Sequence, residues 1–158
     1  MSMTMSISGG KKYKGLLDKI AQYQKGVKAG VPAGATNAST GASIVEYGIY
    51  NELGAPNAGI PSRPFMRQTQ AEKASKWDHI INGNLKFKDI KSNGDGPLVL
   101  CGEAMKGDIK ESIQRGDWEP DAEATVRAKE RRGKSEGGHP LIDTGDLLKS
   151  IIYEVFKL

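Results

Sequence analysis

Few side chains in this chain of 158 residues are suited to nucleophilic or metal chemistry. His79 and His139 are the only histidines, and Cys101 is the only cysteine. Neither histidine has a second histidine, a cysteine or a carboxylate at the spacing of metal ligands, so we expect ordinary surface or capping residues. Cys101 would be a nucleophile only if a histidine met it in space. Its place on an apolar helical stripe favours a buried, inert thiol.

The sequence Asp143-Thr144-Gly145 has the composition of an aspartic protease motif. That chemistry needs two carboxylates in one site, which a second lobe or a second subunit must supply. The surrounding sequence lacks the many short strands of such a fold. Helix capping by Asp143 or Thr144 is the better interpretation. We therefore predict no catalytic residue, no metal and no cofactor.

A basic segment is the main candidate for contact with nucleic acid. Such a segment can bind phosphates, but this one has no aromatic residues for stacking on single strands. Acidic residues also lie within it, so a solvated and partly self-compensated charged face is the favoured interpretation. A surface that faces DNA, for example in the lumen of a ring, is the alternative. Its cations are Arg127, Lys129, Arg131, Arg132 and Lys134.

Length and composition predict one small domain over residues 1–158. The hydrophobic content of 37% and the 20 glycines predict long loops. Residues 33–43 and 121–139 are expected to be flexible or to become ordered on assembly. The formal charge of +4 does not by itself imply nucleic acid. No apolar run approaches the ~18 residues of a membrane span, and a single cysteine fits a reducing compartment, so we expect a soluble intracellular product.

Apolar periodicity predicts an α+β fold with about three helices packed on a short, mostly antiparallel sheet. Residues at helical spacing mark three helices, over 10–25, 64–82 and 97–115. Gly26 and Gly83 are expected to end the first two. Gly102 and Gly107 are expected to weaken the third by roughly 1 kcal/mol each relative to alanine.

Alternation of apolar and polar residues predicts strands over 27–31 and 152–158. Residues 44–53 carry both periods, and we favour an extended start followed by a helical turn. Residues 84–96 are expected to hold a short strand and then a turn. No break in composition indicates a second domain.

The stretch from Val45 to Arg67 is the most informative part of the sequence. An apolar and aromatic run ends in a loop rich in glycine, proline and asparagine, and Pro64 has the fixed φ that suits the start of a helix. Prolines reduce the entropy cost of docking, so we expect residues 54–62 to meet another subunit. Phe65 and Met66 should pack against the body and set the exit angle of the loop. The predicted interface residues are Asn57, Ile60, Pro61, Arg63 and Phe65.

Three segments, in this order, resemble the neck and tail-completion proteins of long-tailed bacteriophages. That family includes the lambdoid minor tail protein Z and the phage virion-morphogenesis proteins. The first segment is Tyr50-Asn-Glu-Leu-Gly54 followed by Ile60-Pro-Ser-Arg-Pro-Phe-Met-Arg67. The second begins at Trp118, with the sequence Trp-Glu-Pro-Asp-Ala-Glu-Ala-Thr-Val-Arg-Ala-Lys. The third begins at Pro140, with the sequence Pro-Leu-Ile-Asp-Thr-Gly-Asp-Leu-Leu-Lys-Ser-Ile.

The resemblance implies a small α+β virion subunit without enzyme activity. Copies would form a ring, expected to be hexameric, at the head-proximal end of the tail, and would complete the tail or join it to the head. The implied partners are further copies, tail tube or terminator proteins, head connector or adaptor proteins, and phage DNA in passage; no membrane is implied. The protein would be assembled in the host cytoplasm. A nucleic-acid-binding module that uses residues 127–134 is the alternative, and a thiol or aspartyl hydrolase is the third hypothesis.

Overall fold

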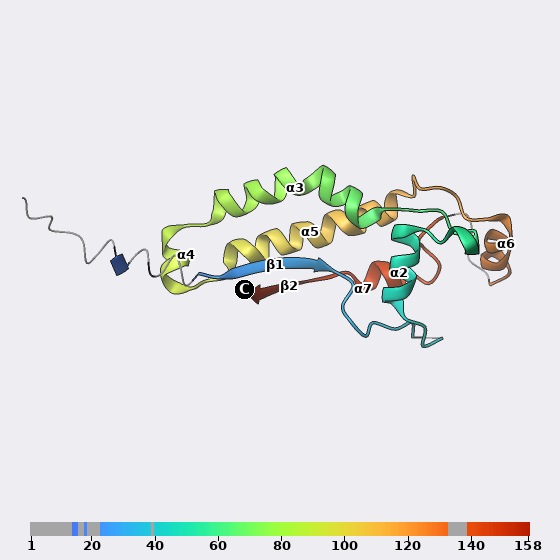
Figure 1. Ribbon diagram of the computed structural model, residues 1–158, viewed down its shortest axis with the longest axis horizontal. Helices are drawn as coiled ribbons and strands as arrows, with labels where there is room; N and C mark the ends of the chain where they lie inside the picture. Colours follow the sequence, from blue (N-terminus) through green and yellow to red (C-terminus); the bar gives the residue numbers. More distant parts are fainter. Residues whose placement is uncertain (1–13, 16–17, 19–22, 39, 133–138) are drawn as a thin grey trace, which may run out of the picture.

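Two long helices and a two-stranded sheet form the layers of the fold (Figure 1). The computed structural model describes residues 14–15, 18, 23–38, 40–132 and 139–158. Helix α3 (Phe65–Asn84) packs along α5 (Gly96–Arg115), and α5 packs in turn on β1 (Lys25–Gly30) and β2 (Ile152–Lys157). The fold is a small α+β domain, as the sequence predicts. None of the helices in these ranges is long and apolar enough to cross a membrane.

The sheet joins segments that are far apart in the sequence. β1 and β2 are antiparallel, with Ala29 opposite Tyr153. Ala29 packs against the core and the Tyr153 ring lies against α5, so this pair faces the helices. Both predicted strands are confirmed, but β1 begins at Lys25 and includes Gly26, which therefore does not end a helix. The remainder of the helix predicted over 10–25 lies mostly outside the described residues.

The two long helices are confirmed, with changed ends. Pro64 is the N-cap of α3, one position before its first residue. The helix continues through Gly83, so the predicted stop there is wrong. A glycine inside a helix costs only about 1 kcal/mol relative to alanine, and the helix ends instead where Leu85 turns extended and its amide donates to the Ile81 carbonyl at 2.8 Å.

Helix α2 (Ile44–Leu53) corrects the extended start predicted for this segment. Ser43 is its N-cap, and the Ser43 hydroxyl oxygen accepts a hydrogen bond from the Glu46 amide at 3.2 Å. Such a cap stabilises the first turn of a helix. The competing strand periodicity arises because α2 has apolar residues on more than one side.

Three shorter α-helices, α4, α6 and α7, follow the long helices or lie between them and β2. Helix α4 (Phe87–Ser92) replaces the strand predicted within 84–96, because Asp89 caps it through the Lys86 amide at 2.9 Å. Helix α6 (Glu123–Arg131) lies in the charged segment, and α7 (Asp146–Ser150) precedes β2. Gly145 is the N-cap of α7 and no side chain caps it, so the capping predicted for Asp143 or Thr144 is wrong.

The core lies where α2, α3, α5 and α7 meet. Phe65 is buried in it, and Met66 packs against it from a half-buried position, so the predicted packing of these two residues against the body is confirmed. Helices α2 and α6 lie toward one end of the elongated molecule, and α4 lies at the other (Figure 1). The buried members of this core are Ile44, Phe65, Ile109, Ile113, Leu141, Leu147 and Ile151.

Candidate assembly surface

The loop over residues 54–62 is a compact turn held by its own backbone. Ala55 and Ile60 exchange two backbone hydrogen bonds, of 2.8 and 3.1 Å, around the short 3-10 helix η1 (Pro56–Ala58). Gly54 enters the turn with φ 78, and a Cβ there would lie 2.9 Å from the Ser62 amide nitrogen. Only glycine fits such a position without strain, so the turn has a fixed conformation.

Side chains from α2 hold the end of this loop where α3 begins. Arg63 Nη1 donates to Asn51 Oδ1 at 2.9 Å. The Glu52 carboxylate accepts hydrogen bonds from the amides of Met66, at 2.8 Å, and Arg67, at 3.0 Å. Glu52 thereby caps α3, whose N-cap is a proline without a capping side chain, and its negative charge suits the helix N-terminus. The loop leaves the body at an angle that α2 and α3 set together.

Arg63 also belongs to a buried ion network. Asp121 Oδ1 lies 2.9 Å from Arg63 Nη2, and Asp121 Oδ2 lies 2.6 Å from Lys129 Nζ. Buried ions need several such partners, because an unpaired one costs several kcal/mol. The remaining donors of the two cations reach backbone carbonyls at 2.8 to 3.1 Å, and these belong to Glu119, Pro120, His139 and Ile142.

Three of the predicted site residues are therefore corrected. Arg63 and Phe65 are buried inside the subunit, so neither contributes the surface contact expected of it. Lys129 is buried too and cannot face DNA. Sequence spacing does not reveal this, because Asp121 is 58 positions from Arg63. The other predicted interface residues, Asn57, Ile60 and Pro61, are exposed or half-buried on the loop.

The outward face of α2 presents exposed apolar side chains that the sequence interpretation did not assign to the interface. Ile49, Tyr50 and Leu53 are 49%, 52% and 60% exposed. At 100° per residue they lie on the side of the helix opposite buried Ile44 and Asn51. The signal in the sequence was the presence of apolar residues around most of the helix, since a helix with a single apolar face buries only that face.

Leu53, the last residue of this apolar row, also lines a groove beside the loop. The groove has a volume of about 450 Å³ and runs between the loop and the segment just before α6. We name the row and the groove together the α2–loop surface. Its lining is mostly apolar and is made up of Leu53, Gly54, Pro56, Gly59, Ile60, Pro61, Ser62, Glu119, Pro120 and Ala122.

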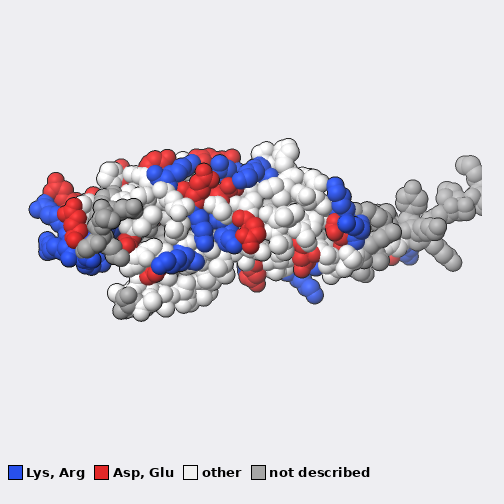
Figure 2. Space-filling model, turned by 180° about the vertical axis from the view of Figure 1, so that it is seen from behind, with Lys and Arg blue, Asp and Glu red and all other residues white. Residues whose placement is uncertain are grey.

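The basic residues around α6 do not form a free cationic face. Arg127 pairs with Glu123 at 2.5 Å, and Arg132 pairs with Asp143 at 3.0 Å. Figure 2 shows acidic and basic side chains interleaved over this end of the molecule. Arg131 is exposed, and Lys134 lies outside the described residues. Interleaved charge produces a weaker field toward phosphates than a patch of one sign.

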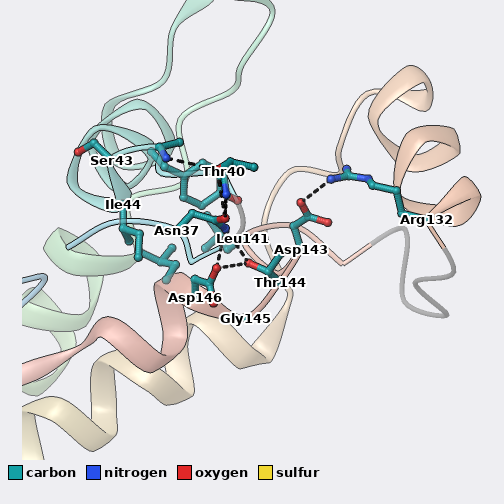
Figure 3. A pocket seen from close by; sticks show the side chains of 13 residues that line it. Asn37, Thr40, Ser43, Ile44, Arg132, Leu141, Asp143, Thr144, Gly145 and Asp146 are labelled. Atoms are coloured by element: carbon teal, nitrogen blue, oxygen red, sulfur yellow. Dashed lines mark hydrogen bonds and ion pairs between the residues drawn. The ribbon is translucent and has the colours of Figure 1, made fainter.

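A cavity of about 400 Å³ opens on another flank of α2 (Figure 3). Its polar end closes on Asp146, whose Oδ2 accepts from Asn37 Nδ2 at 2.6 Å and from Thr144 Oγ1 at 2.7 Å. The bond from Asn37 fastens the segment before α2 to α7. The Tyr47 ring lines the cavity, and burial, assisted by the charge of Asp121, raises the pKa of Tyr47 to about 12.

Cys101, His79 and His139, three residues considered for catalysis, each lie close to a backbone carbonyl. Cys101 is buried with Sγ 3.8 Å from the Trp77 carbonyl oxygen, and burial raises the pKa of its thiol, which disfavours the reactive thiolate. His79 Nδ1 lies 2.6 Å from the Ser75 carbonyl, and His139 Nε2 lies 3.0 Å from that of Gln114. Within the described ranges no three His, Cys, Asp or Glu side chains are grouped so as to hold a metal ion.

No protein-family model, curated protein or solved structure matches this chain. The family suggested by its three motifs therefore stays a prediction. Several residues of these motifs make contacts that stabilise the subunit. Asn51 and Glu52 bind the end of the loop and the start of α3. The pair of Asp121 and Lys129 joins α6 to the segment that leads into α7.

Proposed function

We propose that this protein is a non-enzymatic structural subunit of a tailed-phage virion. Copies of it form a ring at the head-proximal end of the tail, which completes the tail or joins it to the head connector. The observation that carries the proposal is the α2–loop surface, where Ile49, Tyr50 and Leu53 are about half exposed beside an apolar groove. Contiguous apolar surface of this kind usually marks a site of association.

The position and rigidity of this surface suit a ring. A ring needs heterologous contacts, in which one patch of a subunit meets a different patch on the next copy. The α2–loop surface lies toward one end of the elongated subunit (Figure 1), which leaves the rest of the surface for the complementary patch. Because Gly54, Glu52 and the Ala55–Ile60 bonds already fix the loop, docking costs little ordering entropy.

The resemblance of the three motifs supplies the biological context of the proposal. Their residues support the loop and the segment before α6, which are the two walls of the groove. The alternative, a nucleic-acid-binding module that uses residues 127–134, is less well supported. Lys129 is buried, and Arg127 and Arg132 form ion pairs within the subunit.

Light scattering after size-exclusion chromatography, with electron microscopy of the same fractions, tests the proposal. We expect rings of the unmodified protein and loss of rings in Leu53→Asn and Ile49→Asn. Leu100→Asn is the matched control, since Leu100 is 53% exposed but lies on α5. Asn57→Ala and Ile60→Asn should likewise spare folding and impair assembly. A protein that stays monomeric at every concentration and never associates with tails or connectors would overturn the proposal.

A further inference from the structure

We propose that the cavity beside α2 receives one lysine or arginine side chain of a partner polypeptide. The cavity lies between the segment that leads into α2 and the segment that leads into α7 (Figure 3). Its volume of about 400 Å³ falls within the range of small ligand sites, about 300–1,000 Å³. It is separate from the α2–loop surface, and no residue lines both hollows.

The walls of the cavity suit an aliphatic stem. Ile44, Leu141 and Leu147 line it and are buried members of the core, so they form a firm apolar surface. Tyr47 adds the side of an aromatic ring that is still partly exposed to solvent. Lysine and arginine side chains lay their methylene groups along apolar surfaces of this kind while the charged head reaches a polar partner.

The polar end of the cavity has excess negative charge. Among the described residues that line the cavity, the carboxylates of Asp143 and Asp146 face one cation, Arg132, so this lining has a net charge of −1. Asp146 receives hydrogen bonds only from neutral donors, the Asn37 amide and the Thr144 hydroxyl, and among the described residues it forms no ion pair. Lys149, the nearest cation on α7, donates instead to the Thr144 carbonyl at 3.5 Å.

Asp143, the other carboxylate of the lining, has one oxygen without a donor in the described part of the chain. Its Oδ2 pairs with Arg132, which reaches it from the end of α6 (Figure 3). Its Oδ1 is buried and has no hydrogen-bond partner among the residues that the structure describes. A buried acceptor left unpaired is costly. A donor from a guest would remove that cost once the carboxyl group turns toward the opening, and Arg132 is exposed enough to follow it.

Other guests match these features less well. The carboxylates of Asp143 and Asp146 would repel an anion. A purely apolar side chain would bring no positive charge to either carboxylate. A metal ion would need more ligands than the described residues bring together. A side chain presented by a polypeptide fits because the opening lies beside α2, where a partner chain can cross the protein surface. This inference does not depend on ring formation.

NMR titration of the full chain with short acetylated, amidated peptides tests the inference. The peptide Ala-Ala-Lys-Ala-Ala, at millimolar concentration, should shift the backbone amide signals of Gly145 and Leu147 until the site is saturated. A rising salt concentration should weaken the binding of this peptide. The same peptide with norleucine in place of lysine keeps the stem and removes the charge. We expect it to bind at least tenfold more weakly.

Variants separate the charge from the shape of the cavity. Asp146→Asn removes the charge but keeps one oxygen, which can accept from both Asn37 and Thr144 as Oδ2 does now. It should weaken binding of the lysine peptide at least fivefold. Asp143→Asn is a second variant in case the first perturbs folding, and Asp117→Asn is the control. Equal binding of the two peptides, absence of saturable shifts, or butylamine binding as tightly as the lysine peptide would each overturn the proposal, the last by identifying a small amine as the guest.

Discussion

Asp121 lies between two buried cations, and its substitution measures what the ion network contributes. Asp121→Asn keeps the shape of the side chain but leaves Arg63 and Lys129 without their anion. We expect the free energy of unfolding to fall by about 3–5 kcal/mol, measured by urea denaturation. Asp117→Asn is the control, because exposed Asp117 lies 3.5 Å from Arg115 and such surface pairs contribute about 1 kcal/mol or less. Equal effects of the two substitutions would contradict the role of the network.

Phe65 is a second residue whose place in the core gives a measurable prediction. Phe65→Ala removes a buried aromatic ring at the start of α3 and should cost about 3–5 kcal/mol of stability. Leu53→Ala removes an exposed side chain from the neighbouring helix and should leave the stability of the monomer nearly unchanged. The comparison is made by denaturant unfolding at low protein concentration. A small effect at Phe65 would show that the ring is not packed as described.

Asp108 should make the stability of the α3–α5 pair depend on pH. Burial works to raise the pKa of its carboxyl group, but hydrogen bonds from Lys76, at 2.6 Å, and the Trp77 indole, at 2.8 Å, outweigh burial and hold that pKa below its ordinary value of 3.8. Because the folded state has the lower pKa, the stabilisation is complete above the unfolded pKa. It is lost as the pH falls through the folded pKa.

Urea unfolding at a series of pH values between about 6 and 2 measures this dependence. We expect the free energy of unfolding to decline from about pH 4 downward, and Asp108→Asn to flatten part of that decline while lowering stability at neutral pH. A variant with the same pH slope as the unmodified protein would assign the acid sensitivity to other carboxylates.

At the scale of elements, two glycines of α5 have opposite roles. A Cβ at Gly102 would lie 2.3 Å from Cδ2 of the Tyr153 ring, so this glycine lets β2 approach the helix. At Gly107 a Cβ meets nothing within 4 Å. Gly102→Ala should therefore destabilise by about 1–3 kcal/mol through overpacking, whereas Gly107→Ala should stabilise by about 1 kcal/mol through helix propensity. Thermal unfolding of both variants provides the test, and stabilisation by both would contradict the close contact.

The elements that sequence periodicity predicts well are those with one dominant period. Helices α3 and α5 and the strands β1 and β2 bury one side each, and their patterns are clear. Helix α2 was predicted in part as extended, because its second apolar side faces outward and mixes the two periods. Helix α4 was missed because it is short, and because Asp89 in its first turn and Asn93 at its C-cap are residue types that also favour turns. Local capping chemistry decided both cases.

The sequence predicts the loop of the candidate surface, but it does not predict which charged residues near the loop are buried. The glycines and prolines of 54–62 indicate a fixed turn, and Asn57 is exposed as an interface residue must be. Arg63 and Lys129 resemble surface cations in sequence. Only the fold brings Asp121 between them, and the long-range pairing that buries a charge has no signature in spacing.

At the scale of the whole molecule, the α2–loop surface, the cavity and the ion network all lie toward the end of the subunit that holds α2 and α6, and α4 lies at the other end (Figure 1). If copies associate through the α2–loop surface, association stabilises the folded subunit by mass action. The melting temperature of the unmodified protein should therefore rise with protein concentration over about two decades. Leu53→Asn should melt at the same temperature throughout, equal to that of the dilute unmodified protein, while Leu100→Asn should keep the concentration dependence. A concentration dependence that survives in Leu53→Asn would place the contact between copies elsewhere on the subunit.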